Sequence, residues 1–332
     1  MMLHSIDLHK RVLQMASMRA DGSTVLREAR LPATEQALGS YLNQWPGSRH
    51  QLVCETTGSW YWVADYLRSR GQADLKLAHA AKVEAITAAK VKTDGVDARA
   101  LLTMLRLDLV PEAHMISPEL REMRDLPRMR LRLVEKRTSV KNSIARLLEK
   151  YNRASVESLP ELAQMQAQLN HNQAVLLDQQ IKLLEKRLHR ALRPNETVQR
   201  LRRIPGIGRL TAWTLYLEID GIERFATERK FFSYSRVVPG SDNSGNRTRN
   251  KRSRAGNRYL KLALSHAAVR AIQRYAEVKK AYQGKLRKKN EFLARAWVRK
   301  ELARIVFHVL ADGVEYNDTF RGVPLSRPKQ KT

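Results

Sequence analysis

The sequence KVKTDGVDA, at residues 90–98, places two carboxylates three positions apart at the start of a predicted helix. Side chains at positions i and i+3 share one face of a helix, so Asp94 and Asp97 are expected to point into one pocket. Two carboxylates held this close favour a bound cation. The stretch therefore predicts part of a metal-binding site.

Two earlier carboxylates are placed to complete this site. Asp7 follows a strand-like run at residues 3–6, and Glu55 follows the apolar run at residues 52–54. Acids at strand ends and at a helix start can converge on one or two hard divalent ions, the arrangement with which nucleases and polymerases hold a phosphodiester. The candidate metal ligands and catalytic acids are therefore Asp7, Glu55, Asp94 and Asp97.

The order of predicted elements in the first third of the chain is that of an RNase H-like fold. Three strands, a helix, a strand, a helix, a strand and a helix are predicted at residues 3–7, 12–18, 24–30, 34–44, 51–55, 60–70, 74–77 and 97–107. In that fold the first strand, the fourth strand and the last helix bring acids together. Those elements carry the four candidate acids here.

Charge is distributed unevenly along the chain. Its 332 residues include 61 Lys+Arg and 33 Asp+Glu, which gives a formal net charge of +28 and makes a polyanion the default partner. Residues 1–110 carry 14 basic and 11 acidic residues, whereas residues 111–332 carry 47 and 22. The first part is therefore expected to hold a site, and the remainder to offer a surface for nucleic acid.

The single cysteine and the hydropathy pattern restrict the compartment. Cys54 excludes an internal disulfide and fits a reducing environment, and its apolar strand pattern favours buried packing over nucleophilic chemistry. No run of 18 apolar residues exists, and the N-terminus has no hydrophobic signal segment. We therefore expect a cytoplasmic protein with no membrane partner.

A long helical region follows from Ser117 and Pro118, a good N-cap with proline at the first helical position. Pro127 must kink or restart the helix, and Pro160 breaks it again. An apolar stripe comes after that break, although residues 170–172 interrupt it. Intramolecular packing of two antiparallel helices and a dimeric coiled-coil arm both explain such a stripe. Its members are Leu162, Met165, Leu169, Leu176, Ile181, Leu184 and Leu188.

The sequence IPGIG at residues 204–208 lies between two predicted helices and is a helix-hairpin-helix signature. Gly206 and Gly208 would let the backbone approach a phosphate, whose charge is met by amides at the start of the next helix. A plain tight turn between packed helices is the alternative. In a chain this basic, phosphate contact is favoured.

Residues 237–246 are predicted to be a loop, because they carry consecutive turn signals. A Ser hydroxyl on this Gly-flanked loop could act as a nucleophile against a phosphodiester, since nearby cations stabilise both the phosphorane and the alkoxide. An ordinary solvated Ser is the alternative. Residues 225–234 are predicted to be an apolar, aromatic helix, and the helices predicted at 259–275 and 291–311 would be scaffold. The cations after the loop are candidate nucleic-acid ligands: Arg247, Arg249, Lys251, Arg252, Arg254 and Arg258.

Six short motifs, taken in order, resemble those of one family. They are SIDLHK at 5–10, CETTGSW at 54–60, KTDGVDA at 92–98, IPGIG at 204–208, NSG at 243–245 and RAGNRYL at 254–260. They are similar to G-I-D-x-x-K, C-E-A-T-G-x-Y, K-T-D-x-x-D-A, I-P-G-I-G, S-G and K-x-G-N-x-x-L of the DEDD transposases of the IS110 group of insertion sequences. These are relatives of the Piv DNA invertases and are also called bridge-RNA-guided recombinases. Ser5 stands where the family motif has Gly.

The resemblance implies a mechanism and a set of partners. Mg²⁺ held by the four acids would activate and orient the target phosphate, and Ser244 would join covalently to DNA during strand exchange. A structured guide (bridge) RNA would pair with donor and target DNA, so that base pairing selects the sequence while the protein contacts backbone and shape. Composite sites would be built from different subunits of a homodimer or tetramer.

The predicted fold class is α/β plus α, in three parts. Residues 1–112 form a RuvC-like DEDD domain, residues 113–195 a helical coiled-coil arm, and residues 196–325 a mostly helical transposase domain with the helix-hairpin-helix and the serine loop. The predicted function is an RNA-guided transposase or recombinase of an insertion sequence. Two alternatives stay open: a RuvC-like metal-dependent junction nuclease in which Ser244 is incidental, and an inactive nucleic-acid-binding remnant. The Ser-Gly loop argues against the first, and the intact acids argue against the second.

Overall fold

The computed structural model divides into two compact units, Met1–Pro118 and Glu119–Thr332, and each is described by itself. It describes residues 1–22, 24–56, 58–87, 94–192, 195–244, 247–251, 256–316, 319–320 and 323–324. Within these, only the backbone is described for residues 81, 85, 87, 94–96, 240–244, 247–251, 319–320 and 323–324. No helix among the described residues is long and apolar enough to cross a bilayer.

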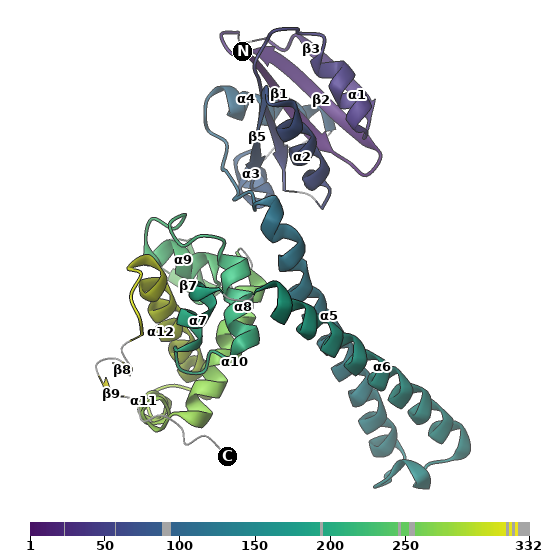
Figure 1. Cartoon of the computed structure of the whole chain (residues 1–332), viewed down its shortest axis with the longest axis vertical. Helices are drawn as coiled ribbons and strands as arrows, with labels where there is room; N and C mark the ends of the chain where they lie inside the picture. The colour runs from purple at the N-terminus through teal and green to yellow at the C-terminus, as the bar shows by residue number, and fades with distance from the viewer. Residues whose placement is uncertain are drawn as a thin grey trace. The chain divides into compact units, whose positions relative to one another are not determined.

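The first unit is built on a five-stranded mixed sheet with strand order β3-β2-β1-β4-β5 (Figure 1). Strand β2 is antiparallel to both β1 and β3, whereas β4 is parallel to β1 and to β5. This topology is consistent with the predicted RNase H-like fold. The strands are β1 Met2–Leu8, β2 Val12–Arg19, β3 Arg27–Pro32, β4 His50–Glu55 and β5 Ala73–Ala78.

Side-chain alternation along the central strands divides the core into two layers. On one face Ile6 and Leu52 pack with helices α1 Glu35–Leu42 and α2 Trp60–Arg70. On the other face Leu3 and Val53 pack with helix α4 Asp94–Arg106. Every second residue of β1 and β4 therefore points toward α4, and this parity decides where the acids at the strand ends lie.

Local signals explain most boundaries of the first unit. Thr34 caps α1 by accepting a hydrogen bond from the Ala37 N–H, and Gly71 ends α2 in the left-handed conformation at φ 67°. Strand β3 begins three residues later than predicted because it is an exposed edge without clear alternation. Helix α3, Ala80–Thr87, is an addition that the sequence analysis missed.

The second unit begins with two long antiparallel helices, α5 Pro118–Lys150 and α6 Glu161–Ala191 (Figure 1). Two ion pairs show that the helices are antiparallel. Arg130 of α5 pairs with Glu185 of α6, and the later residue Arg137 pairs with the earlier residue Asp178. The short 3-10 helix η1, Val156–Ser158, lies in the connection between them. Pro127 lies inside α5, so the expectation that it could restart the helix is wrong.

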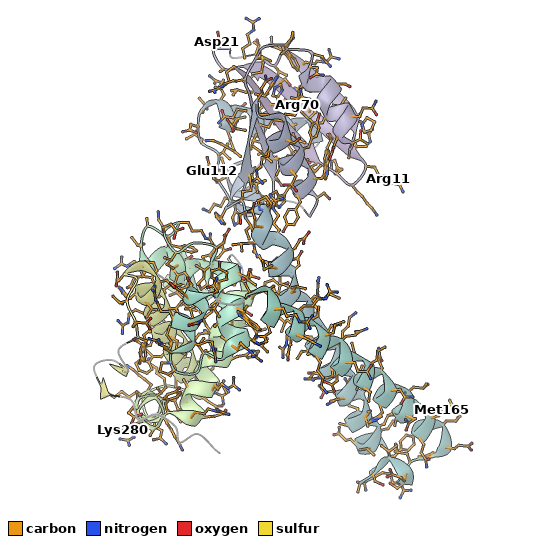
Figure 2. All side chains as sticks on the ribbon, viewed as in Figure 1. Arg11, Asp21, Arg70, Glu112, Met165 and Lys280 are labelled. Carbon is orange, nitrogen blue, oxygen red and sulfur yellow. The ribbon has the colours of Figure 1, made fainter. Side chains whose placement is uncertain are left out.

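The apolar stripe predicted on the arm divides between two faces of α6. Ile181, Leu184 and Leu188 are buried, and the first two pack against Leu133 of α5. The intramolecular interpretation is therefore correct for this part. The other members lie on an exposed face, from which Met165 projects (Figure 2). That exposed set is Leu162, Met165, Leu169 and Leu176, and Leu183 continues it.

The rest of the second unit is a helical domain around one large apolar core. Residues 240–244 form a strand paired with residues 247–251, so the expected loop at 237–246 is in part a β-hairpin. The helix predicted at 291–311 has those bounds, and the tail from 326 lies outside the described residues. The elements are α7 Glu196–Arg202, α8 Arg209–Ile219, α9 Glu228–Tyr234, β6 Gly240–Ser244, β7 Arg247–Lys251, α10 Arg258–Arg274, α11 Ala276–Leu286, α12 Glu291–Ala311, β8 Thr319–Phe320 and β9 Val323–Pro324.

Candidate active site and nucleic-acid interface

Two of the four candidate acids stand at the ends of neighbouring parallel strands. The register of β1 and β4 pairs Ile6 with Cys54, so Asp7 and Glu55 are the next residues along each strand. Both follow the parity of Leu3 and Val53 and therefore face α4. Both are partly exposed. Carboxylates at adjacent, open strand ends can be reached by a hard cation and its substrate.

A buried hydrogen bond fixes the first turns of α4 against the same strand. The Ser5 hydroxyl donates to the Ala98 carbonyl oxygen at 2.6 Å, and both residues have no exposed surface. Asp97 precedes Ala98 and is partly exposed. Ser5 is two residues before Asp7 on the same face of β1. Its hydrogen bond therefore joins α4, which carries Asp97, to the strand that carries Asp7.

The described side chains do not assemble the complete four-acid cluster. Among them, no group of three or more His, Cys, Asp or Glu side chains is close enough to hold a metal ion. Asp7 Oδ2 instead lies 3.1 Å from His9 Nε2, a neighbour that the sequence analysis did not single out. Side-chain positions of Asp94 lie outside the description. The donor set of carboxylate oxygens suits Mg²⁺, and its four-residue form stays a prediction.

Cys54 lies on the opposite face of the sheet from these acids. It is fully buried, and this burial, with the charge of Glu55, raises the pKa of the thiol to about 12. A thiol with that pKa stays protonated and is a poor nucleophile. The predicted packing role is therefore supported by its environment.

The glycines of the predicted helix-hairpin-helix have a packing role in the structure. Gly206 has φ +79°, and a Cβ there would lie 2.2 Å from the Ala267 carbonyl oxygen. A Cβ at Gly208 would lie 2.7 Å from Arg270 Nη1. Gly206 therefore lets the hairpin pack tightly on the backbone of α10, whereas a Cβ at Gly208 would meet only the movable end of an arginine side chain. Neither observation requires or excludes phosphate contact. Their nucleic-acid role stays a prediction.

The candidate nucleophile lies at the end of a strand. Ser244 is the last residue of β6 and pairs with Arg247 across the turn, while Ser241 pairs with Asn250 nearer the hairpin base. The backbone of Arg249 and Lys251 lies in β7, and Arg258 opens α10. Gly245, Arg252 and Arg254 lie outside the described residues.

A backbone hydrogen bond joins the segment after the β6–β7 hairpin to the helix before it. The Asn257 N–H donates to the Tyr234 carbonyl oxygen, so the segment that leaves β7 returns to the helix that precedes β6. Gly256, at φ +94°, permits that approach, because a Cβ there would lie 2.5 Å from the same oxygen. The Asn257 side chain also caps α10 by accepting hydrogen bonds from the Tyr259 and Leu260 amides.

A buried carboxylate connects Asn257 to α5. Glu218 has no exposed surface and accepts hydrogen bonds from Arg124 Nε at 2.8 Å, Arg128 Nε at 2.6 Å and Asn257 Nδ2 at 2.7 Å. The Arg128 guanidinium also lies 4.5 Å from the centroid of the Tyr259 ring. The sequence analysis missed Glu218. Its signal is one acid inside the otherwise uncharged run LTAWTLYLEI of α8.

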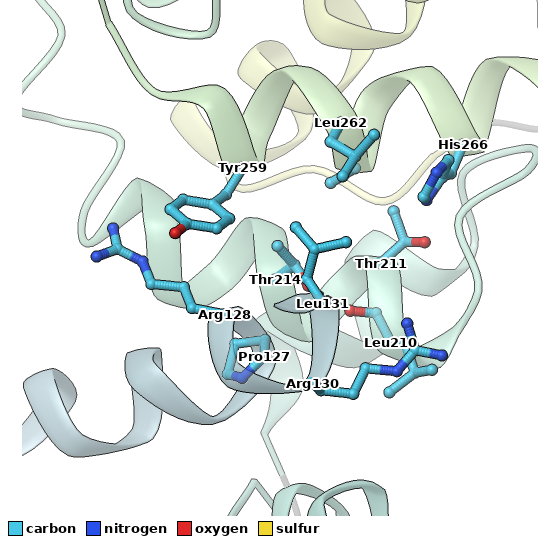
Figure 3. Close-up of a pocket in the computed structure, with 11 residues that line it drawn as sticks. Pro127, Arg128, Arg130, Leu131, Leu210, Thr211, Thr214, Tyr259, Leu262 and His266 are labelled. Carbon is cyan, nitrogen blue, oxygen red and sulfur yellow. Dashed lines mark hydrogen bonds between the residues drawn. The ribbon is translucent and has the colours of Figure 1, made fainter. Parts of the chain in front are cut away.

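A small cavity adjoins this cluster where α5, α8 and α10 meet (Figure 3). Its volume of about 60 Å³ has room for water molecules but not for a nucleotide. Burial, and then the nearby Arg130 charge, lower the pKa of His266 on its wall. Its lining residues include Pro127, Arg128, Arg130, Leu131, Leu210, Thr211, Thr214, Tyr259, Leu262 and His266.

A mixed five-stranded sheet with carboxylates at the ends of β1 and β4, followed by a largely helical region, is consistent with the RNase H-like fold of metal-dependent nucleases and transposases. Residues 5–153 match a DEDD transposase family, and residues 198–283 match the family described as "Transposase IS116/IS110/IS902 family". The chain belongs to this IS110 family of transposases, with the DEDD domain first and the second domain C-terminal to it.

Curated relatives point the same way. The chain is 31% identical over 180 residues to "Transposase for insertion sequence element IS1111A" of Coxiella burnetii, a match covering 48% of this chain and 49% of that protein. It is 26% identical over 249 residues to "Putative transposase y4pF/y4sB" of Sinorhizobium fredii, which covers 68% and 64% of the two chains. The chain thus spans about half to two thirds of the length of these relatives.

Proposed function

We propose that this protein is a transposase that cleaves and rejoins DNA strands of an insertion sequence through a covalent serine intermediate. The observation that carries the proposal is the placement of Asp7 and Glu55 at adjacent strand ends facing the helix of Asp97. Family membership supports the same reaction class. A nucleophilic Ser244 that acts together with this site would distinguish a transposase from a metal-dependent nuclease.

The four acids Asp7, Glu55, Asp94 and Asp97 would hold Mg²⁺. When bound, the ion supplies Lewis-acid polarisation of the phosphate and charge stabilisation worth several kcal/mol. The chain's own contribution is to keep these carboxylates at strand ends, with α4 held by the Ser5 to Ala98 hydrogen bond. The His9 imidazole beside Asp7 restrains that carboxylate.

Ser244 would be the nucleophile. Its hydroxyl oxygen bonds to phosphorus as its proton passes to a base or water, and the bond from phosphorus to one deoxyribose oxygen breaks. The displaced oxygen takes a proton and leaves as a hydroxyl. The hydroxyl of a partner strand then attacks the phosphoserine, which restores the serine and joins the new strand. Arginines after β6 would stabilise the developing charge.

The partners of this reaction would be donor DNA, target DNA and a structured guide RNA. Residues 111–332 contain 47 basic and 22 acidic residues, so most of the excess positive charge lies there. Such an excess suits two polyanions held together. RNA pairing would supply sequence choice while the protein contacts phosphates.

The active form would be a homodimer or tetramer assembled through α6. Leu162, Leu169, Leu176 and Leu183 are spaced by seven residues and are 53–76% exposed. A seven-residue repeat on the free side of a helix matches the seam of a coiled coil with a second copy. We expect Leu169→Lys with Leu176→Lys to yield monomers in sedimentation analysis, while the control His171→Lys, on another exposed face of α6, leaves the oligomer intact.

Labelled DNA that carries the element's junction tests the reaction. The protein is co-expressed with its flanking non-coding DNA, incubated with that DNA and Mg²⁺, and analysed on a denaturing gel. We expect a protein-linked DNA band that disappears in Ser244→Ala and persists in Ser241→Ala. Omission of the non-coding DNA should remove the band if the RNA is required.

Other outcomes identify the alternatives. Free cleaved ends without a covalent band would indicate a metal-dependent junction nuclease and leave Ser244 without a catalytic role. Binding without cleavage under all conditions would indicate an inactive nucleic-acid-binding remnant. Either result contradicts the serine mechanism.

A further inference from the structure

A second cavity, of about 410 Å³, lies between the end of α6, helix α7 and the start of α8. Sites for small molecules usually measure about 300–1,000 Å³, so this cavity has room for one nucleotide. It opens beside the hairpin at residues 204–208, since α7 leads into that turn and Arg209 follows it. The reaction proposed above gives it no role. It is lined by His189, Leu192, Asn195, Val198, Gln199, Arg202, Arg209 and Trp213.

One wall of the cavity is aromatic. Trp213 is 3% exposed, and the centroid of the His189 ring lies 5.8 Å from that of its indole. The Arg209 guanidinium lies 5.5 Å from the indole centroid. Leu192 and Val198 are both buried and add apolar surface. Indole, imidazole and guanidinium planes all stack on nucleobases, without preference for a particular base.

The permanently charged groups of the cavity are all cationic donors. No carboxylate lines it, whereas Arg202 and Arg209 are both exposed cations. Asn195 Oδ1 already accepts the Val198 N–H at 3.0 Å as the cap of α7, so its amide NH₂ is the group it offers. This set disfavours a cation and favours a ligand that joins a flat ring to an anion. A nucleotide has that chemistry.

We propose that this cavity binds one unpaired nucleotide of a strand held by the second unit. The base lies against the partly exposed His189 ring, which lies beside the buried Trp213 indole, and Arg202 and Arg209 contact its phosphates. The proposal rests on the proposed function only in taking nucleic acid as the partner. It adds a site that distinguishes an unpaired base from a paired one, which a phosphate contact at the hairpin cannot do.

Photocrosslinking with the full-length protein tests the site. Single-stranded DNA and RNA oligonucleotides each carry one 5-iodouracil, and crosslinked peptides are identified by mass spectrometry. We expect crosslinks at His189 that decrease at least about tenfold when the same uracil is paired in a duplex. Trp297, over which Lys285 Nζ lies at 5.0 Å, is the aromatic control outside this cavity, because it is partly exposed like His189. Crosslinks at Trp297 as often as at His189 would overturn the proposal, and the stronger of the DNA and RNA signals identifies the source of the base.

Affinity measurements give a second readout without altering the core. The double variant Arg202→Ala with Arg209→Ala should weaken single-strand binding about tenfold, and duplex binding clearly less. The charge-matched double variant Arg287→Ala with Lys288→Ala, at two exposed cations after α11, should not separate the two substrates. Equal losses for both substrates in the cavity variant contradict the cavity proposal. If the covalent serine product still forms while cavity crosslinks are absent, the cavity proposal alone is wrong; if no nucleic acid binds at all, both proposals are wrong.

Discussion

In the first unit Asp7 and Glu55 stand at partly exposed strand ends, whereas in the second unit Glu218 is fully buried between Arg124 and Arg128. The buried acid obtains its cations from the chain, in a geometry that satisfies both carboxylate oxygens. The exposed acids lie where an external cation and a phosphate can reach them. Carboxylates therefore serve stability in one unit and are available for chemistry in the other.

The largest effect is expected from substitution of the exposed acids, which should lower activity but not stability. Asp7→Asn and Glu55→Gln each remove a proposed metal ligand, so formation of the covalent DNA product should fall about a thousandfold or more. The free energy of unfolding should change by less than about 1 kcal/mol, because both positions are partly exposed. Gel assays and chemical denaturation measure the two quantities. Normal activity in both variants would remove the acids from the mechanism.

The buried acid should behave in the opposite way. Glu218→Gln leaves two mostly buried guanidinium groups, with side chains 13% and 20% exposed, without their counter-charge, which costs about 3–5 kcal/mol of unfolding free energy. Glu315→Gln is the matched control, because Glu315 pairs with Arg200 and Arg203 but is half exposed, and its loss should cost at most about 1 kcal/mol. Denaturant unfolding followed by the signal of the second unit compares the two. Equal losses would show that the Glu218 cluster has no special role.

The contrast between the acids at strand ends and the buried Glu218 also shows which features could be predicted from the sequence. The placement of Asp7 and Glu55 at strand ends could be predicted because strand ends are local patterns, and parity along the strands then places both on one face. Glu218 was missed because its partners lie 90 or more residues before it and 39 after it. Likewise, the stripe of α6 did not indicate which leucines face α5, since both of its faces contain apolar residues at helical spacing. The β6–β7 hairpin was taken for a loop because polar residues fill both strands.

A buried histidine in the first unit gives a smaller effect that depends on pH. His4 is fully buried, with Nδ1 2.7 Å from Ser17 Oγ and Nε2 3.0 Å from His50 Nδ1. Burial, and then the charge of His50, lower the pKa of His4 to about 3. The unfolded chain binds a proton near pH 6.5, whereas folded His4 does not until about pH 3. The contribution is therefore complete above pH 6.5 and is lost as pH falls toward 3.

Hydrogen exchange of β1 amides in the full-length protein measures this loss. Between pH 6 and 4 the opening free energy of the first unit should fall with a slope of about 1.4 kcal/mol per pH unit for each such histidine. His50, whose pKa burial also lowers, adds to the slope. His4→Asn should reduce the slope, while His171→Asn on the exposed side of α6 should not. An unchanged slope in His4→Asn contradicts the assignment.

The smallest effect sharpens the comparison within the first unit, because Ser5 supports the exposed acids without being one. Ser5→Ala removes the hydroxyl that donates to the Ala98 carbonyl oxygen, and one such hydrogen bond is worth about 1 kcal/mol of stability. Since α4 then loses its tie to β1, half-saturation of covalent-product formation should require several-fold more Mg²⁺, with little change at saturating Mg²⁺. Ser5→Thr keeps the hydroxyl and should recover part of the metal affinity if the added methyl fits. A purely structural role would lower stability with no shift in the Mg²⁺ requirement, and that result would separate Ser5 from the site.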